Sequence, residues 1–169
     1  MICDNPVRIW LIIGLISVLA ACGGGGTATA TAPVALKSID GNWAIDCFPD
    51  GATFFKIVAN FNQGMGSAVT TIYTDAACTT VMMIDPPQTM TYVLGEAVTV
   101  DGSVAGITSA TQFDSTDTTP GPEFGEVDYD LVAIKDNKLY VGYSDGANDG
   151  TTPTLRPTQL DPDIVLTKM

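Results

Sequence analysis

Short segments in which apolar and polar residues alternate, separated by turn-forming residues, recur along most of this chain. Residues 42–48 place Trp43, Ile45 and Cys47 on one predicted face, and residues 53–61 repeat the same two-residue period. The segments follow one another roughly every ten residues, and we find no convincing helical period among them. The pattern therefore predicts an all-β fold, built as an antiparallel meander of eight or nine short strands.

Turn residues set the expected strand boundaries. The predicted strands cover residues 42–48, 53–61, 67–74, 78–84, 89–100, 104–113, 127–135, 138–144 and 164–168. Asp101 and Gly102 form a strong two-residue hairpin signal between the fifth and sixth strands. Residues 114–126 are expected to form a long acidic loop. Because closure into a barrel removes exposed strand edges, we expect residues 36–169 to form one small closed β-barrel domain.

The beginning of the chain carries an export signal. Residues 1–8 form a short start that ends in Arg8, and residues 9–19 (IWLIIGLISVL) form an apolar run that is too short to span a bilayer as a helix. The run leads into Leu19-Ala20-Ala21-Cys22, which resembles the lipobox of bacterial lipoproteins, where an aliphatic and two small residues precede a lipidated cysteine. The alternative is an ordinary signal peptide followed by an incidental cysteine.

The lipobox resemblance implies a processing route and a location. Residues 1–21 would be removed as a signal peptide, and Cys22 would become an N-terminal residue that carries fatty acyl chains such as palmitate. Two or three such chains anchor a protein stably in a membrane. Residues 22–35, rich in Gly, Thr and Ala, would form a flexible tether. Gly23, which stands where Asp would signal retention in the inner membrane, favours the outer membrane, with the domain on its periplasmic or cell-surface side.

Cys47 and Cys78 are the two cysteines that remain in the predicted barrel domain. In an exported protein they are expected to form a disulfide, because the compartment is oxidising. Free thiols or a redox couple are the alternatives. An up-and-down meander places both cysteines at one barrel end but three strand spacings apart, about 14 Å in a flat sheet. A bridge therefore requires strong curvature or a loop that folds inward.

The charge and the missing histidine exclude several functions. The chain has 19 acidic and 7 basic residues, a formal net charge of −12, and no basic stripe, so we expect no nucleic-acid binding. Without histidine there are no Ser–His or Cys–His nucleophiles and few routes to a transition-metal site. Residues 145–150 put Ala147 where a calcium loop needs an oxygen ligand. We expect no metal, no other cofactor and no enzymatic activity, with a histidine-independent hydrolase as a remote alternative.

Two stretches resemble lipocalin-like barrels. Gly41-Asn42-Trp43 resembles the G-x-W motif of lipocalins, in which the tryptophan plugs one end of the barrel. The stretch from Tyr129 through residues 138–142 and 149–153 to Arg156 resembles a group of uncharacterised bacterial lipoproteins with small lipocalin-like barrels. The two resemblances imply the same architecture, and the second adds no assigned activity.

Candidate ligand contacts are aromatic residues of the predicted strands: Trp43, Phe55, Tyr73 and Tyr92. They would line a cavity for a small hydrophobic ligand, or fill a closed core instead. Arg156, the only arginine after the predicted signal peptide, would clamp a ligand carboxylate or latch its own loop to Asp161, Asp163 or another acid. A hollow barrel would make this protein a small-molecule binder. A filled barrel would make it an envelope structural or protein-interaction module, with an envelope protein as its partner.

Overall fold

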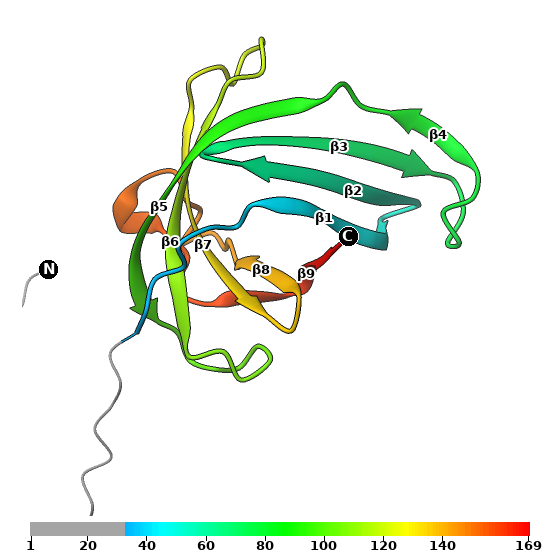
Figure 1. Ribbon diagram of the computed structural model, residues 1–169. Helices are drawn as coiled ribbons and strands as arrows, with labels where there is room; N and C mark the ends of the chain where they lie inside the picture. Colours follow the sequence, from blue (N-terminus) through cyan, green and yellow to red (C-terminus); the bar gives the residue numbers. More distant parts are fainter. Residues whose placement is uncertain (1–32) are drawn as a thin grey trace, which may run out of the picture. The chain divides into compact units, whose positions relative to one another are not determined.

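The computed structural model describes residues 33–169, which form an almost purely β-structured domain (Figure 1). Its strands are β1 (Gly41–Asp50), β2 (Thr53–Asn62), β3 (Met65–Tyr73), β4 (Val81–Ile84), β5 (Gln88–Thr99), β6 (Ser109–Asp117), β7 (Val127–Lys135), β8 (Lys138–Gly142) and β9 (Leu160–Lys168). The helical content of this range is one 3-10 turn, η1 (Pro153–Leu155). The all-β prediction is confirmed.

Several predictions fall on the part of the chain before residue 33. The signal peptide, the lipidated Cys22 and residues 22–32 of the tether lie outside the described residues, so they stay predictions. Within residues 33–169, no helix has the length and hydrophobicity that a membrane crossing requires.

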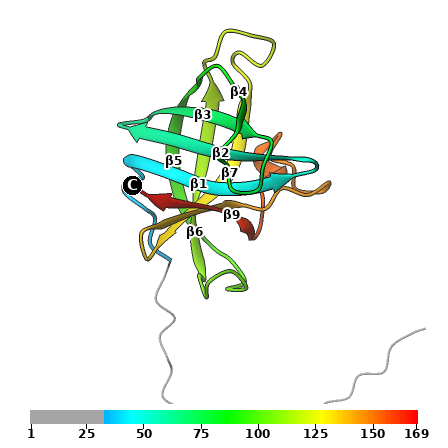
Figure 2. The same ribbon diagram turned by 90° about the vertical axis from the view of Figure 1, so that its right-hand side faces the viewer.

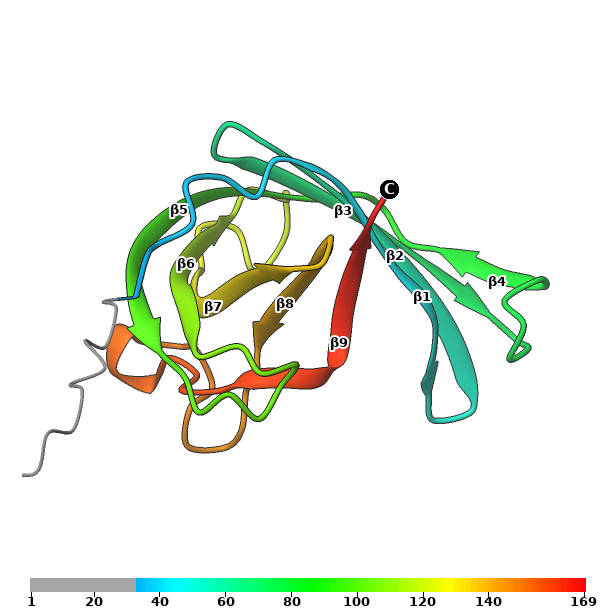
Figure 3. The same cartoon turned by 60° about the horizontal axis from the view of Figure 1, so that its bottom comes forward.

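Every strand pairs antiparallel to its neighbours, and the sheet closes on itself. The order along the sheet is β2-β1-β9-β8-β7-β6-β5-β3-β4, and β2 also pairs with β3, which closes eight strands into a barrel. Figure 3 looks into this ring. β3 pairs with β5 through residues 65–68 and with β4 through residues 71–73. β4 and β5 therefore lie one after the other along the same edge of β3, and β4 stands outside the ring.

Strands β1 to β4 extend beyond the barrel. β1 pairs with β9 only through Trp43 and Ala44, although it stays paired with β2 as far as Asp50. β2 and β3 remain paired over the same stretch, and β4 covers the outer end of β3. We call residues 45–58 and 69–84 the arm. Figure 1 shows the arm projecting past β5 to β9, and Figure 2 views the molecule from the side of the arm.

The barrel wall separates an inner from an outer apolar core. The inner core consists of Ile39, Trp43, Ile45, Ala59, Tyr92, Phe113, Val132, Leu139 and Leu166. The outer core consists of Val100, Val104, Ile107, Ala110, Leu131, Ala133, Tyr140 and Leu160. Side chains alternate along β7, so that Val132 belongs to the inner core while Leu131 and Ala133 belong to the outer one. β7 is therefore covered on both faces.

The predicted hairpin between the fifth and sixth strands is present as β5 and β6, but the predicted two-residue turn at Asp101 and Gly102 is wrong. Val100 N donates to Thr108 O at 3.1 Å, so residues 101–107 form a loop, and β6 begins at Ser109 rather than at residue 104. The physical reason lies in the outer core, where Val104 and Ile107 are buried. Burial of these two side chains on the outside of the barrel stabilises the loop. The sequence of the turn alone gives no information about this tertiary stabilisation.

Candidate functional site

The four aromatic residues predicted to line a ligand cavity do not share one cavity. Trp43 and Tyr92 are buried in the inner core, with 1% and 8% of their surfaces exposed. Phe55 lies on the arm, where its ring packs against that of Phe48 with centroids 5.2 Å apart. Tyr73 ends β3 at the outer end of the arm. The structure therefore brings two of the four together and separates the others from them.

Aromatic rings occupy the barrel interior beside Trp43. The ring centroid of Tyr92 lies 5.4 Å from that of Phe61 and 5.4 Å from that of Phe113. Trp43 Nε1 donates to Ile39 O at 2.8 Å, so the indole N–H is satisfied inside the core. Contacts at these distances are those of a closely packed protein interior. This section of the barrel is filled by the protein's own side chains.

The segment before β1 packs across the same core. Leu36 N donates to Thr111 Oγ1 at 2.7 Å, and Ile39 is 1% exposed. Asp40 Oδ1 accepts from the Tyr92 hydroxyl at 2.9 Å and from Gln63 N at 3.0 Å. The Tyr92 hydrogen bond, followed by that of Gln63, lowers the pKa of Asp40. Polar contacts thus hold this segment against the barrel from both β2–β3 and β5.

Arg156 lies outside the inner core and holds its loop to β6 and β7. Its Nη2 donates to Asp114 Oδ1 at 2.7 Å, and its Nη1 donates to Asp130 O at 2.6 Å. The guanidinium carbon lies 5.5 Å from the centroid of the Tyr129 ring. With 11% of its side chain exposed, Arg156 is committed to these intramolecular contacts. The acid that it meets is Asp114, not either of the two acids near the C-terminus.

A partly buried carboxylate lies next to this latch. Asp130 Oδ1 accepts from Leu131 N at 2.6 Å and from Gly142 N at 3.0 Å. Burial raises the pKa of Asp130 to about 7, and the nearby carboxylate of Asp128 adds to the rise, whereas the two N–H donors and Arg156 oppose it. A Cβ on Gly142 would collide with the Asp130 carboxylate. The sequence alone does not indicate the raised pKa of Asp130, since the burial of its carboxylate depends on how Gly142 packs beside β7.

The acidic loops hold no metal-ion arrangement. An open cavity of about 380 Å3 lies at the mouth of the barrel, and its lining includes Asp117, Glu123, Glu126 and Asp128. Even so, no group of three or more His, Cys, Asp or Glu side chains that could hold a metal ion occurs within residues 33–169. In the loop considered for calcium, Asp145 Oδ1 instead accepts from the backbone N–H groups of two following residues. The cavity is polar and open, unlike a pocket for a hydrophobic ligand.

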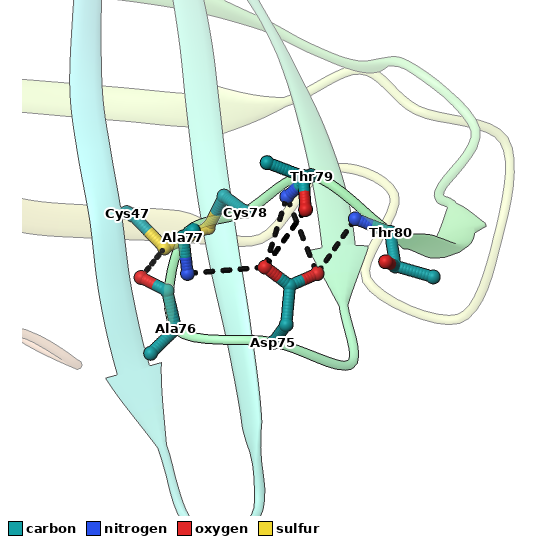
Figure 4. Close-up of a disulfide and its surroundings, with 7 residues drawn as sticks. All are labelled: Cys47, Asp75, Ala76, Ala77, Cys78, Thr79 and Thr80. Carbon is teal, nitrogen blue, oxygen red and sulfur yellow. Dashed lines mark hydrogen bonds between the residues drawn. A yellow bond between two sulfur atoms is a disulfide. The ribbon is translucent and has the colours of Figure 1, made fainter.

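The predicted disulfide between Cys47 and Cys78 is confirmed, with the two Cα atoms 5.7 Å apart. β2 lies between β1 and β3, so the loop of residues 74–80 crosses β2 to bring Cys78 to β1 (Figure 4). Cys47 lies at a bulge in β1, between Ile45 and Phe48. The bridge does not have to span three strand spacings, because Cys78 lies in the loop before β4 rather than on the fourth strand, and this loop folds back across β2.

Asp75 organises the same loop. Its carboxylate accepts from Ala77 N at 3.1 Å, from Thr79 Oγ1 at 3.0 Å and from Thr80 N at 2.6 Å (Figure 4). The Thr80 N–H has the largest effect among these donors, which together lower the pKa of Asp75 to about 2. Thr74 N donates to Thr80 O and closes the base of the loop. The disulfide and Asp75 together determine where β4 leaves the loop.

β4 is an exposed apolar strand at the edge of the arm. Its four residues are Val81, Met82, Met83 and Ile84, with exposed fractions of 52%, 61%, 49% and 62%. It is hydrogen-bonded to β3 alone among the described strands. Large apolar side chains on an unpaired strand edge are typical of a surface that meets another polypeptide. Sequence reasoning missed this feature, because four apolar residues between turns predict a buried strand as readily as an exposed one.

Comparison with known proteins gives no family for this chain. No family model matches the chain, and no curated protein matches it. The closed antiparallel barrel is compatible with a lipocalin-like architecture.

Proposed function

We propose that this protein is a lipid-anchored, exported protein-interaction module, in which a filled barrel presents the arm and β4 is the binding surface. The observation that carries the proposal is the exposed, apolar edge of β4. Isolated exposed apolar residues are ordinary on protein surfaces, but four in succession on a strand with one free edge offer both backbone hydrogen bonds and apolar contacts. Such an edge can take up an extended segment by strand addition.

The filled interior supports an interaction module over a hollow-barrel binder. The ring cluster of Phe61, Tyr92 and Phe113 and the hydrogen-bonded Trp43 occupy the space that a hydrophobic ligand would need. Arg156, the candidate carboxylate clamp, is engaged by Asp114 and by backbone carbonyls. A packed barrel also makes a stiff base for the arm, because closely packed interiors resist deformation.

Export and anchoring rest on the lipobox resemblance at Cys22, and the Cys47–Cys78 disulfide is consistent with an oxidising compartment. Replacement of Cys22 by Ala is expected to yield a soluble or uncleaved protein that no longer carries fatty acid. Mass spectrometry of the N-terminus and membrane fractionation measure this outcome. An unmodified N-terminus on the wild-type protein would refute anchoring and leave the β4 surface to be tested separately.

The binding surface is tested by placing a photo-crosslinking amino acid at Met82 in the full chain, in cells. Irradiation is expected to give a discrete adduct of higher mass. The matched control carries the same group at Val93, which is 67% exposed, lies on β5 outside the arm and pairs with Asp114 of β6. Equal or absent adduct formation at the two positions would contradict the proposal that β4 is the binding surface.

A further inference from the structure

We infer that the partner of β4 is a second copy of this chain, joined through antiparallel pairing of the two β4 strands about a two-fold axis. This inference rests on the proposed function, since it names the occupant of the same edge. Three properties of the described residues carry it: the hydrogen-bonding direction of the strand, its short length and the distribution of charge.

The backbone of β4 leaves hydrogen-bonding groups on its free side. Asp85 N donates to Thr70 O at 2.9 Å, and the pairs Met83–Ile72 and Ile84–Thr71 continue the same antiparallel register. Because alternate residues of an antiparallel strand point their N–H and C=O groups to opposite sides, those of Ile84 point away from β3. A second β4, running the other way, presents the matching groups and the same apolar side chains. An isologous contact of this kind is self-complementary by symmetry.

The length of β4 favours a closed pair over an open chain of molecules. Asp85, Pro86 and Pro87 follow β4 directly, and proline offers no N–H to a strand ladder. The braced loop of residues 74–80 precedes it. Strand addition is therefore limited to a few residues. A two-fold pair of β4 strands engages this edge in both molecules, so neither copy retains a free β4 edge.

The charge distribution favours a contact through β4 over a contact between the two barrels. Residues 65–84 contain one charged residue, Asp75, in a chain whose formal net charge is −12. Contacts between two barrels would bring many like charges together, whereas β4 itself carries no charge. Antiparallel pairing also reverses the strand direction between the copies, so the two barrels lie at opposite ends of the joined sheet. A contact through β4 thus buries apolar side chains while it keeps the two acidic barrels apart.

Sedimentation velocity on the full chain in a mild detergent, over a concentration series, tests the inference. We expect a monomer–dimer equilibrium that strengthens as salt rises, because salt screens repulsion between the acidic bodies and leaves apolar contacts intact. Met82→Glu is expected to raise the dimer dissociation constant by about tenfold or more, since two-fold symmetry brings the two new charges close together. Val93→Glu adds the same charge at an equally exposed site outside the arm and should leave the dimer unchanged.

The possible outcomes separate this inference from the proposed function. A dimer that Met82→Glu weakens and Val93→Glu does not, with a crosslinked adduct of twice the chain mass, supports self-pairing. A monomer at every concentration, together with a crosslink from residue 82 to a different protein, overturns self-pairing and keeps β4 as the binding surface. A monomer with no crosslink overturns both. A dimer insensitive to Met82→Glu and Ile84→Glu places the contact elsewhere, and far-UV circular dichroism confirms that each variant is folded.

Discussion

Replacing both cysteines of the Cys47–Cys78 bridge with alanine is expected to lower the free energy of unfolding by about 3–4 kcal/mol. The bridge joins residues that are 31 apart in the sequence. In the chain-entropy treatment, a closed loop of this length removes about 12 cal/mol/K from the unfolded chain, which amounts to about 3.7 kcal/mol at 25 °C. For a domain the size of residues 33–169, such a loss corresponds to a fall in melting temperature of about 10 °C.

Urea titration followed by tryptophan fluorescence measures this loss, because Trp43 is 1% exposed in the inner core and reports on the barrel rather than on the arm. The slope of the titration should rise slightly, since the unfolded chain without the bridge is less compact and exposes more surface. Wild-type protein in reducing buffer serves as the control and should match the double variant. A loss below about 1 kcal/mol would refute the reasoning, because it would mean that the unfolded chain gains little freedom when the bridge is removed.

Three further variants test the packing of the barrel. Phe113→Ala removes a ring from the centre of the inner core and is expected to cost about 3–5 kcal/mol in urea titration, and the variant should bind benzene while the wild type does not. Asp130 has a folded-state pKa of about 7, above its unfolded value, so the folded protein retains a proton that the unfolded chain loses. Wild-type stability should therefore fall by up to about 4 kcal/mol between about pH 4 and pH 7, and denaturant midpoints for Asp130→Asn should show a much flatter profile. Gly142→Ala drives a methyl group into the Asp130 carboxylate and to 2.8 Å from Pro157 Cβ, and calorimetry should show a melting temperature lower by several degrees.

Strands with one buried face were predictable because that face imposes a two-residue period on the sequence. Residues 53–61 illustrate this, since β2 begins at the predicted position, Thr53. The disulfide was predictable by counting the cysteines of a domain that the sequence predicts to be exported. In contrast, Val104 and Ile107 lie in a loop that covers the outer core, and their burial depends on a surface assembled from distant strands. Local periodicity carries no information about such a surface.

The candidate site could not be predicted for a related reason. The sequence of residues 81–84 does not indicate whether the edge of this strand is paired or free. That depends on where the neighbouring strands end. The burial of Asp130 likewise depends on tertiary packing, because Gly142 comes back beside β7 at the end of the β7–β8 hairpin. Arg156 was recognised as a latch or clamp from its isolation among acids, but its partner, Asp114, is set by the packing of the loop on β6.

Two proline-containing segments explain why β4 has a free edge at all. In a continuous barrel, the strand beside β4 would be an extension of β6. The pairing of β6 with β5 reaches Met90 and Asp117, after which Pro120 and Pro122 turn the chain away. Residues 85–87 separate β4 from β5, so β4 continues along β3 where β6 no longer follows. The edge of β4 is therefore exposed because β6 ends before it reaches β4. A longer β6 that paired with β4 would remove the surface on which the proposed interaction depends.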